Sequence, residues 1–411
     1  MHMDRTEQLQ VLAENCKSII PDGGLEKKLA LGRPLIVKLG LDPTAPDIHL
    51  GHVVVLRKLR QFQDLGHTVV LIVGDFTAKI GDPSGKSKTR PALSDGEIKK
   101  NAATYKKQVG KILDRKKLQI RFNSEWLKKL KAEDIISFMA KTTIAQILVR
   151  DDFRKRLHLD GDAAKPSDSE LGFHEVMYPL LQAYDSVAIH ADVEIGGTDQ
   201  TVNLIMGRRL QQKLGQEPQV VMTMPLLVGL DGKQKMSKSL GNYISVTESA
   251  ENIYGKIMSL PDELILQYRR LLTNSDQTVD RSDEAAMKLG KLHPMPLKLG
   301  LAFSIAEELT SAGEAVKAEA HFRNTFQHRE FPKDAKELSV SRPCSLFDLI
   351  TEKYKLFPSK SEARRKLAEG AIRINGKKVV DGAITVNPVN GEILELQIGK
   401  LGFYRVTRQK K

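Results

Sequence analysis

Two short motifs in this 411-residue chain combine residue types that bind phosphate groups. The first, His49-Leu50-Gly51-His52, begins a predicted helix directly after the turn-forming residues 42–47. Free N–H groups at a helix start favour anions, and two imidazoles three residues apart share one face. The second, Lys235-Met236-Ser237-Lys238-Ser239, places two lysines on a loop between Gly232 and Gly241, which suits a triphosphate. Alone, each motif also fits a plain structural role, as capping histidines or as a solvated loop.

A third group of polar residues lies at helical spacing. Tyr178, Gln182 and Asp185 follow one another at i, i+4 and i+7, so an aromatic ring, an amide and a carboxylate share one helix face. Such a face could bind a polar substrate or form the hydrated edge of a helix. The spacing by itself leaves both interpretations open.

The first motif lies inside a β-α-β pattern. Residues 34–41 and 69–74 are apolar runs without alternation, which is typical of parallel strands covered on both faces. The helix that starts near His49 carries apolar residues at helical spacing as far as Leu65, and Gly66 supplies a stop. The sequence therefore predicts an α/β fold.

A second α/β stretch follows a long helical region. Helical patterns fill much of residues 95–183, with a short strand candidate at 118–122. Strands are then predicted at 187–195 and 219–223, with a helix at 199–212 between them. The α/β pattern thus returns after the helical region.

The remainder of the chain predicts two further parts. Residues 246–329 show only helical patterns. After residue 343 a small α+β pattern follows, in which 359–369 is a basic helix and 371–380 is a hairpin that turns at Asn375-Gly376.

The net charge of +13 suggests an acidic partner but does not separate RNA from a phosphorylated metabolite. Residues 351–411 hold 14 basic and 6 acidic residues, a net charge of +8, and residues 86–131 hold 15 and 4, a net charge of +11. A solvated helix face would also explain such runs. Cys16 and Cys344 are far apart and predict neither a disulfide nor a metal site. No apolar run approaches the roughly 20 residues of a membrane span, so we expect a cytoplasmic protein without membrane contact.

Taken together and in order, the motifs resemble those of the bacterial tyrosyl-tRNA synthetases, a class I aminoacyl-tRNA synthetase family. The resemblance covers essentially the whole chain and matches the branch with an intact KMSKS loop. The segments that carry it are Asp42-Pro43-Thr44-Ala45-Pro46-Asp47 with the first motif, Gly81-Asp82-Pro83-Ser84-Gly85-Lys86, Gln182-Ala183-Tyr184-Asp185, Gly196-Gly197-Thr198-Asp199-Gln200 and the second motif.

The resemblance implies three domains. A Rossmann-like catalytic domain would span residues 1–228, with an insertion and dimerisation segment at about 86–185. The KMSKS loop and an all-α anticodon-binding domain would span 229–342, and a small α+β S4 RNA-binding domain 343–411.

The implied reaction is activation of L-tyrosine by ATP, which releases pyrophosphate, and transfer of the tyrosyl group to the 3' end of tRNA(Tyr). Because a carboxylate is already a nucleophile, this chemistry needs positioning and charge stabilisation rather than a general base. The resemblance assigns catalysis to His49, His52, Lys235, Lys238, Ser239, Lys86, Arg90 and Thr44, and ATP binding to Asp42, Gly51, Gly197, Asp199, Met236 and Ser237. ATP would arrive with Mg²⁺ as a substrate complex, since the sequence shows no dedicated metal site.

Tyrosine binding is implied for Thr77, Asp82, Tyr178, Gln182, Asp185, Gln200 and Lys38. Asp185 matches the family residue that accepts the phenol hydrogen. Lys38 departs from the more familiar branch, which has a tyrosine there. It could donate to the phenol oxygen or point elsewhere, and the sequence does not decide.

The resemblance also implies a homodimer formed through the insertion, where Ile135, Ile136, Phe138, Met139, Ile144 and Ile147 could supply either the dimer face or a core. In the S4-like part, Arg364, Arg365, Lys377 and Lys378 would contact tRNA phosphates. The alternatives are a tryptophan-activating class I synthetase, a small-molecule adenylyltransferase and a catalytically inactive RNA-binding paralogue. The Gln182–Asp185 motif and the basic tail favour the tyrosine enzyme.

Overall fold

The computed structural model describes residues 3–44, 46–84, 93–157, 171–327, 335–389, 392–399 and 402–409. The chain divides into two compact units, residues 1–312 and 313–411, and each is described by itself. Within the described ranges, no helix is long and apolar enough to cross a membrane.

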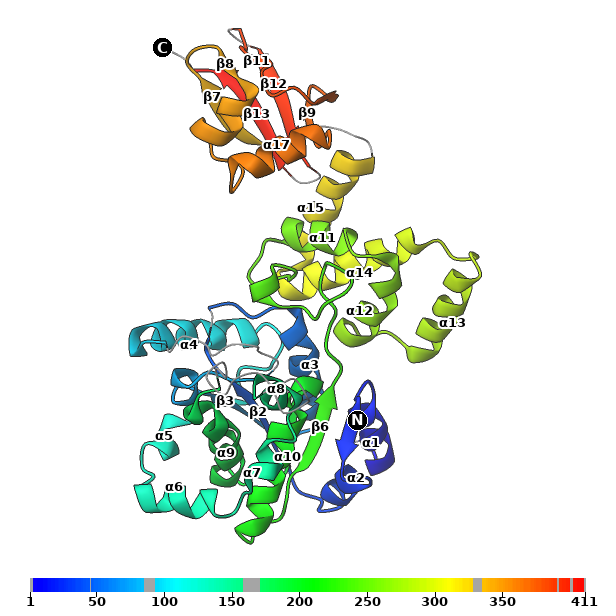
Figure 1. The fold of residues 1–411 in the computed structure, drawn as a ribbon. Coiled ribbons are helices and arrows are strands. Elements are labelled where there is room, and N and C mark those ends of the chain that lie inside the picture. Colours follow the sequence, from blue (N-terminus) through cyan, green and yellow to red (C-terminus); the bar gives the residue numbers. More distant parts are fainter. Residues whose placement is uncertain are drawn as a thin grey trace. The chain divides into compact units, whose positions relative to one another are not determined.

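A six-stranded sheet forms the centre of the first unit (Figure 1). Its strand order is β1-β6-β5-β2-β3-β4. Five strands run parallel, and only β1 pairs antiparallel, with β6. The strands are β1 (Ser18–Ile20), β2 (Ile36–Leu41), β3 (Thr68–Val73), β4 (Leu118–Phe122), β5 (Val193–Gly197) and β6 (Val220–Met224). The α/β class that the sequence predicts is confirmed, whereas the short edge strand β1 was not anticipated.

The strand order contains a reversal that matters for function. From β2 the chain proceeds to β3 and β4 on one side, and later to β5 and β6 on the other. The crevice between β2 and β5 is therefore a topological switch point, where α/β sheets bind ligands at the carboxyl ends of their strands.

Three helices matter for the site, namely α3 (Leu50–Asp64), which begins with the first motif, α9 (Phe173–Ala188), which carries Tyr178, Gln182 and Asp185, and α10 (Thr201–Lys213), which follows Gln200. Helix α9 extends four residues past Tyr184, so the strand expected from residue 187 begins only at Val193. Val187 is buried between α9 and α10 with Leu210, and this packing overrides the strand preference of a β-branched residue.

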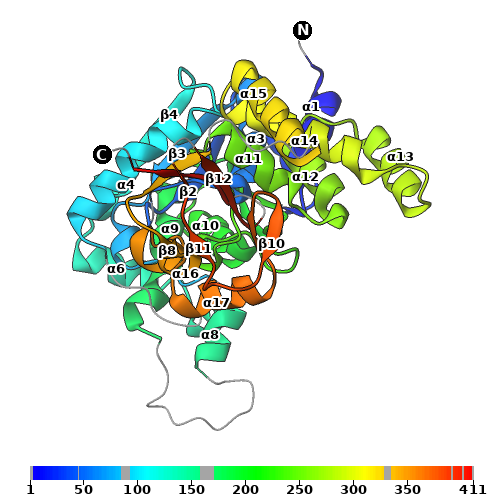
Figure 2. The same cartoon turned by 90° about the horizontal axis from the view of Figure 1, so that it is seen from above.

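Helices form within the insertion, as predicted. They are α4 (Asp95–Val109), α5 (Ser124–Leu127), α6 (Ala132–Met139), α7 (Ile144–Ile147) and α8 (Asp151–Arg156). A second helical group follows the sheet: α11 (Ala250–Met258), α12 (Ile265–Leu272), α13 (Gln277–Lys288) and α14 (Pro294–Leu309). Figures 1 and 2 both show α11, α12 and α14 side by side, with α13 at the outer edge. At the other end of the chain, α1 (Arg5–Ala13) and α2 (Gly24–Leu29) flank β1.

The second unit is a small α+β structure. After α15 (Ala312–Phe322) it contains a sheet of order β10-β9-β12-β13-β7 and a two-stranded sheet of β8 and β11. The strands are β7 (Lys336–Val340), β8 (Cys344–Ser345), β9 (Ile372–Ile374), β10 (Lys377–Val379), β11 (Thr385–Val386), β12 (Ile393–Ile398) and β13 (Gly402–Arg408), and the helices are α16 (Leu346–Asp348) and α17 (Lys360–Ala368).

The predicted basic helix and hairpin of this unit both form. Ser359 caps α17, and β9 and β10 are joined by Asn375 and Gly376, which have positive φ angles of 50° and 76°. Two such residues in succession are what a tight hairpin turn requires. Because β7 pairs with β13, the sheet begins before residue 343, where the domain boundary was expected.

Candidate active site

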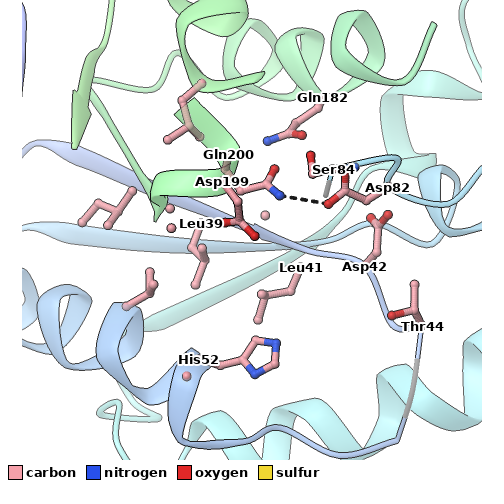
Figure 3. A pocket seen from close by; sticks show the side chains of 18 of the residues that line it. Leu39, Leu41, Asp42, Thr44, His52, Asp82, Ser84, Gln182, Asp199 and Gln200 are labelled. Atoms are coloured by element: carbon pink, nitrogen blue, oxygen red, sulfur yellow. Dashed lines mark hydrogen bonds between the residues drawn. The ribbon is translucent and has the colours of Figure 1, made fainter. Parts of the chain in front are cut away.

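A cavity of about 300 Å³ opens at the switch point between β2 and β5. Its wall combines the end of β2, the start of α3, the end of β5 and one face of α9 (Figure 3). Sixteen residues that the sequence singled out line it: Asp42, Thr44, His49, Gly51, His52, Thr77, Asp82, Tyr178, Gln182, Asp185, Gly197, Asp199, Gln200, Lys235, Met236 and Ser237. The face of α9 formed by Tyr178, Gln182 and Asp185 is therefore a cavity wall and not the hydrated edge of the helix.

His49 and His52 stand at the first turn of α3. His49 is the N-cap, and its Nδ1 accepts the Gly51 N–H at 3.2 Å, while the Nδ1 of His52 accepts the His49 N–H at 3.3 Å. Burial lowers the pKa of both imidazoles, that of His52 to about 4; Lys238 adds to this effect at both histidines, and Lys235 at His49. Both rings are thus neutral at pH 7, and since each Nδ1 accepts, the proton lies on Nε2. Each histidine therefore presents a neutral N–H donor at Nε2.

The second motif closes the same end of the cavity. Lys235 Nζ lies 2.8 Å from Asp199 Oδ2. Met236 is buried, and its N–H donates to the Leu227 carbonyl at 2.8 Å. This hydrogen bond attaches the loop to the segment that follows β6. Lys238 donates to the backbone carbonyl of Asp47, and burial lowers its pKa. Lys238 and Ser239 are not part of the cavity wall.

Asp42 lies near the middle of the cavity wall and is held by two hydroxyl groups. Thr77 donates to its Oδ1 at 2.7 Å and Tyr178 to its Oδ2 at 2.9 Å. Removal from bulk water raises the pKa of Asp42 to about 7. Gly74 faces this pair, and a Cβ at that position would overlap both Asp42 Oδ1 and Thr77 Oγ1.

Asp185 is buried and also lines the cavity. Trp126 Nε1 donates to its Oδ1 at 2.8 Å, and Asn123 Nδ2 lies 3.4 Å from its Oδ2. Burial raises the pKa of Asp185 to about 7. The sequence did not single out Trp126 or Asn123; the only available signal was that Trp126 is the sole tryptophan of the chain.

Two further polar groups, those of Gln182 and Asp82, line the cavity. The Oε1 atom of Gln182 is buried and has no hydrogen-bond partner among the described residues. Asp82 accepts from Gln200 Nε2 at 2.9 Å and from the Ser84 N–H at 2.9 Å. A cationic group bound here would face oxygen atoms from three side chains, those of Asp42, Asp82 and Gln182.

Lys38 is the sequence-based assignment that the structure does not support. It is absent from the cavity wall and fully buried behind α9. Its ammonium reaches three acceptors: the Gln182 carbonyl at 3.1 Å, Ser186 Oγ at 2.7 Å and Glu194 Oε1 at 2.8 Å. Lys38 is thus held by two hydrogen bonds and by an ion pair with Glu194, itself a residue of the cavity wall.

Lys86 and Arg90, the other two assigned residues, lie outside the described residues. Where the chain is described, no group of three or more His, Cys, Asp or Glu side chains could hold a metal ion.

Comparison with known proteins places the geometry in context. Residues 30–327 match the family model "tRNA synthetases class I (W and Y)", and residues 328–398 match "Tyrosine--tRNA ligase SYY-like C-terminal domain". The chain is 47% identical to a tyrosine–tRNA ligase of Moorella thermoacetica, over 99% of this chain and 97% of the relative. It is 46% identical to one from Thermotoga maritima, over 98% of each.

Solved structures agree on the fold. A tyrosyl-tRNA synthetase from Archaeoglobus fulgidus, in complex with L-tyrosine, superposes with a TM-score of 0.61 at 24% identity, over 77% of this chain and all of the other. At this identity the likeness concerns the fold alone.

Proposed function

The chain belongs to the tyrosine–tRNA ligases, within the class I aminoacyl-tRNA synthetases, and from that membership we propose how its residues divide the work. The enzyme activates tyrosine with ATP and transfers it to tRNA. The observation that carries the residue assignments is the cavity at the switch point, whose one end offers cationic and N–H donors and whose other end offers buried carboxyl groups.

In the activation step, the tyrosine carboxylate attacks the α-phosphorus of ATP and pyrophosphate leaves. His49 and His52 would donate from Nε2 to the triphosphate, and Lys235 and Lys238 would add positive charge. Such donors act by stabilising charge that develops in the transition state, and each contributes about 3 kcal/mol, roughly 100-fold in rate. Ser239, Thr44, Lys86 and Arg90 complete the proposed phosphate contacts; Gly51, Met236 and Ser237 would accommodate the nucleotide, and Gly197 and Asp199 would hold the ribose.

Mg²⁺ would enter with ATP as part of the substrate. In that role the triphosphate oxygens would hold most of the metal's coordination sphere.

The opposite end of the cavity would hold tyrosine. Asp42, Asp82, Thr77, Tyr178 and the unpartnered Oε1 of Gln182 would surround the ammonium group, and Gln200 would meet the carboxylate. Asp185 would accept the phenol hydrogen. Phenylalanine would leave this buried acceptor without its donor, which costs the desolvation of a polar group.

In the second unit, four exposed cations support contact with tRNA phosphates. Arg364 and Arg365 lie on α17, and Lys377 and Lys378 on β10. We propose that this unit binds tRNA(Tyr). We also propose that helices α11 to α14 form the anticodon-binding part.

A homodimer is also part of the proposal. On the insertion, Ile136, Ile144, Val149 and Phe173 expose between 63% and 74% of their surface, which is unusual for large apolar residues. Phe138 and Ile147 instead pack against the α9–α10 core, so the six apolar residues noted in the sequence divide between an exposed face and a core. A cytoplasmic location completes the proposal.

The test is amino-acid-dependent ATP–pyrophosphate exchange with each of the twenty amino acids, without tRNA. We expect exchange with tyrosine alone. Exchange with tryptophan would contradict the assignment of Asp185, and folded protein that supports no exchange would indicate the inactive RNA-binding paralogue.

A further inference from the structure

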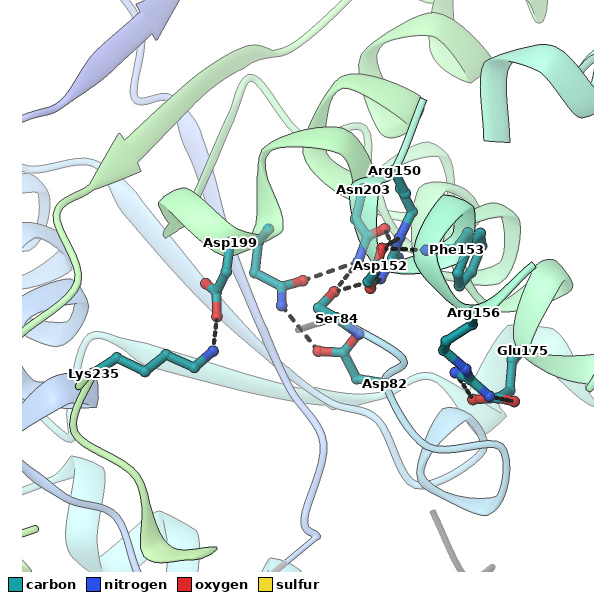
Figure 4. A network of polar contacts seen from close by, with 11 residues as sticks. Asp82, Ser84, Arg150, Asp152, Phe153, Arg156, Glu175, Asp199, Asn203 and Lys235 are labelled. Carbon is teal, nitrogen blue, oxygen red and sulfur yellow. Dashed lines mark hydrogen bonds and ion pairs between the residues drawn. The ribbon is translucent and has the colours of Figure 1, made fainter. Parts of the chain in front are cut away.

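Five polar residues form a closed ring of hydrogen bonds beside the cavity, four through their side chains and Ser84 through both its hydroxyl and its N–H; one of them, Arg150, belongs to the insertion (Figure 4). Arg150 Nη1 donates to Asn203 Oδ1 at 2.8 Å and its Nη2 to Ser84 Oγ at 3.1 Å. Asn203 Nδ2 donates to Gln200 Oε1 at 3.0 Å, and Gln200 Nε2 to Asp82 Oδ2 at 2.9 Å. The Ser84 N–H donates to Asp82 Oδ1 at 2.9 Å and closes the ring.

The two ends of this ring determine its direction. A guanidinium can only donate and a carboxylate can only accept, whereas each amide can present either its oxygen or its nitrogen. Because Asn203 must offer its oxygen to Arg150, its nitrogen faces Gln200. Gln200 must then accept with its oxygen, so its NH₂ group faces Asp82 and the cavity. The two ends of an amide have nearly the same shape, so hydrogen bonding alone sets which end points where.

Arg150 is itself held in one orientation. Its side chain is 4% exposed, and Asp152 accepts from its Nε at 3.0 Å and from its Nη2 at 2.5 Å. It does not line the cavity, whereas Asp82, Ser84 and Gln200 do. Arg150 can therefore influence a ligand only through the side chains that it orders.

We propose that Arg150 is a positioning residue that fixes Gln200 as a hydrogen-bond donor toward the carboxylate of the amino-acid substrate. The inference rests on the proposed function, in which Gln200 meets that carboxylate. Asp82 takes one N–H of the Gln200 amide, and the second N–H of the same NH₂ group serves the substrate.

The experiment compares two ligands, L-tyrosine and tyramine, which has the same phenol and ammonium groups but no carboxylate. Their dissociation constants are measured by calorimetry on the full chain, for wild type and for Arg150→Gln. A glutamine can accept as well as donate, so Asn203 is no longer forced to offer its oxygen, and only Asp82 still orients Gln200. We expect the dissociation constant for tyrosine to rise roughly 10-fold to 100-fold, the range for loss of a hydrogen bond to a charged group. That for tyramine should stay within about threefold.

Three further variants separate positioning from folding. Arg150→Lys, which still only donates, should recover most of the tyrosine affinity. Asn203→Asp keeps the size of the side chain but cannot donate to Gln200, so it should reproduce the selective loss even if Arg150→Gln does not fold. Arg156→Gln is the matched control, because Arg156 lies on α8, for which Arg150 is the N-cap, is also 4% exposed and pairs with Glu175 at 2.8 Å outside the ring. It should affect both ligands alike.

Equal weakening of tyrosine and tyramine in both Arg150→Gln and Asn203→Asp would mean a merely structural role and would overturn the inference. Unchanged tyrosine affinity in both variants would overturn it as well. If the wild-type chain binds tyramine as tightly as tyrosine, the proposed carboxylate contact of Gln200 fails first, and the inference falls with it.

Discussion

The buried ion pair between Lys38 and Glu194 provides the sharpest test of the structure. The two side chains are 0% and 1% exposed and their charged atoms lie 2.8 Å apart. Lys38→Met removes one charge and leaves the other buried without its partner. Removing one member of such a pair typically costs about 3 to 5 kcal/mol, because the remaining charge stays desolvated. We expect a loss of this size in the free energy of unfolding of the catalytic unit.

The double variant Lys38→Met/Glu194→Gln separates the ion pair from the packing. It removes both charges, and a glutamine can still accept from Ser186 and Gln219, which now donate to Glu194. Replacing both members of a buried pair is often nearly neutral. We therefore expect the double variant to lie within about 2 kcal/mol of wild type. Urea unfolding followed by the emission of Trp126 reports on the first unit alone, since the chain has no other tryptophan.

The same variants decide whether Lys38 contacts substrate. Because Lys38 is buried against α9, we expect Lys38→Met to change mainly the free energy of unfolding. A variant that unfolds like wild type but loses more than tenfold in tyrosine affinity would refute this reasoning and would return Lys38 to the phenol end of the cavity.

Three other outcomes are expected. Trp126→Phe removes the 2.8 Å donor to Asp185 and should lower kcat/KM for tyrosine in pyrophosphate exchange roughly tenfold or more; an unchanged value would mean that Asp185 does not need this donor. Gly74→Ala should abolish tyrosine binding because the added Cβ overlaps Asp42. In the control Gly300→Ala the added Cβ meets no atom within 4 Å, so tyrosine binding should be unchanged and the thermal midpoint should be unchanged or raised. Burial raises the pKa of both Asp42 and Asp185 from 3.8 to about 7, so the folded state binds more protons than the unfolded chain between pH 4 and 7. Across that window, rising pH should decrease the free energy of unfolding while it strengthens tyrosine binding, which needs the ionised carboxylates; a flat tyrosine titration from pH 5.5 to 8 would contradict this.

Much of the catalytic unit could be predicted from local patterns. Continuous apolar runs identify β2 and β3 because parallel strands are covered on both faces, and the i, i+4, i+7 spacing identifies the cavity face of α9. What failed depends on tertiary contacts. Strand β1 has only three residues, all partly exposed, so its sequence carries no strong period. Val187 looks like a strand residue until the packing of α9 against α10 is known.

The site shows the same division. The sequence identified the residues within motifs. It did not identify the side chains that hold those residues in place. Trp126 is 59 residues from Asp185 along the chain, and Arg150 is 53 from Asn203, so no spacing rule connects them. Lys38 was assigned to tyrosine because it stands where the more familiar branch of the family has a tyrosine, on the strand β2. Successive side chains of a strand point to opposite faces, and only the structure shows which face meets α9.

The ion pair between Lys235 and Asp199 has a consequence for nucleotide entry. Asp199 is proposed to bind the ribose and Lys235 the phosphates. In the structure, however, the Asp199 carboxylate and the Lys235 ammonium are paired with each other. The nucleotide must therefore compete with the protein itself, and both partners must be released before either can serve. The side chains are 38% and 26% exposed, so the pair contributes at most about 1 kcal/mol, a weakening of apparent ATP affinity of roughly fivefold. An ion pair of this strength is weak enough for the nucleotide to displace. Without the nucleotide, the ion pair links the loop that carries Lys235 to Asp199.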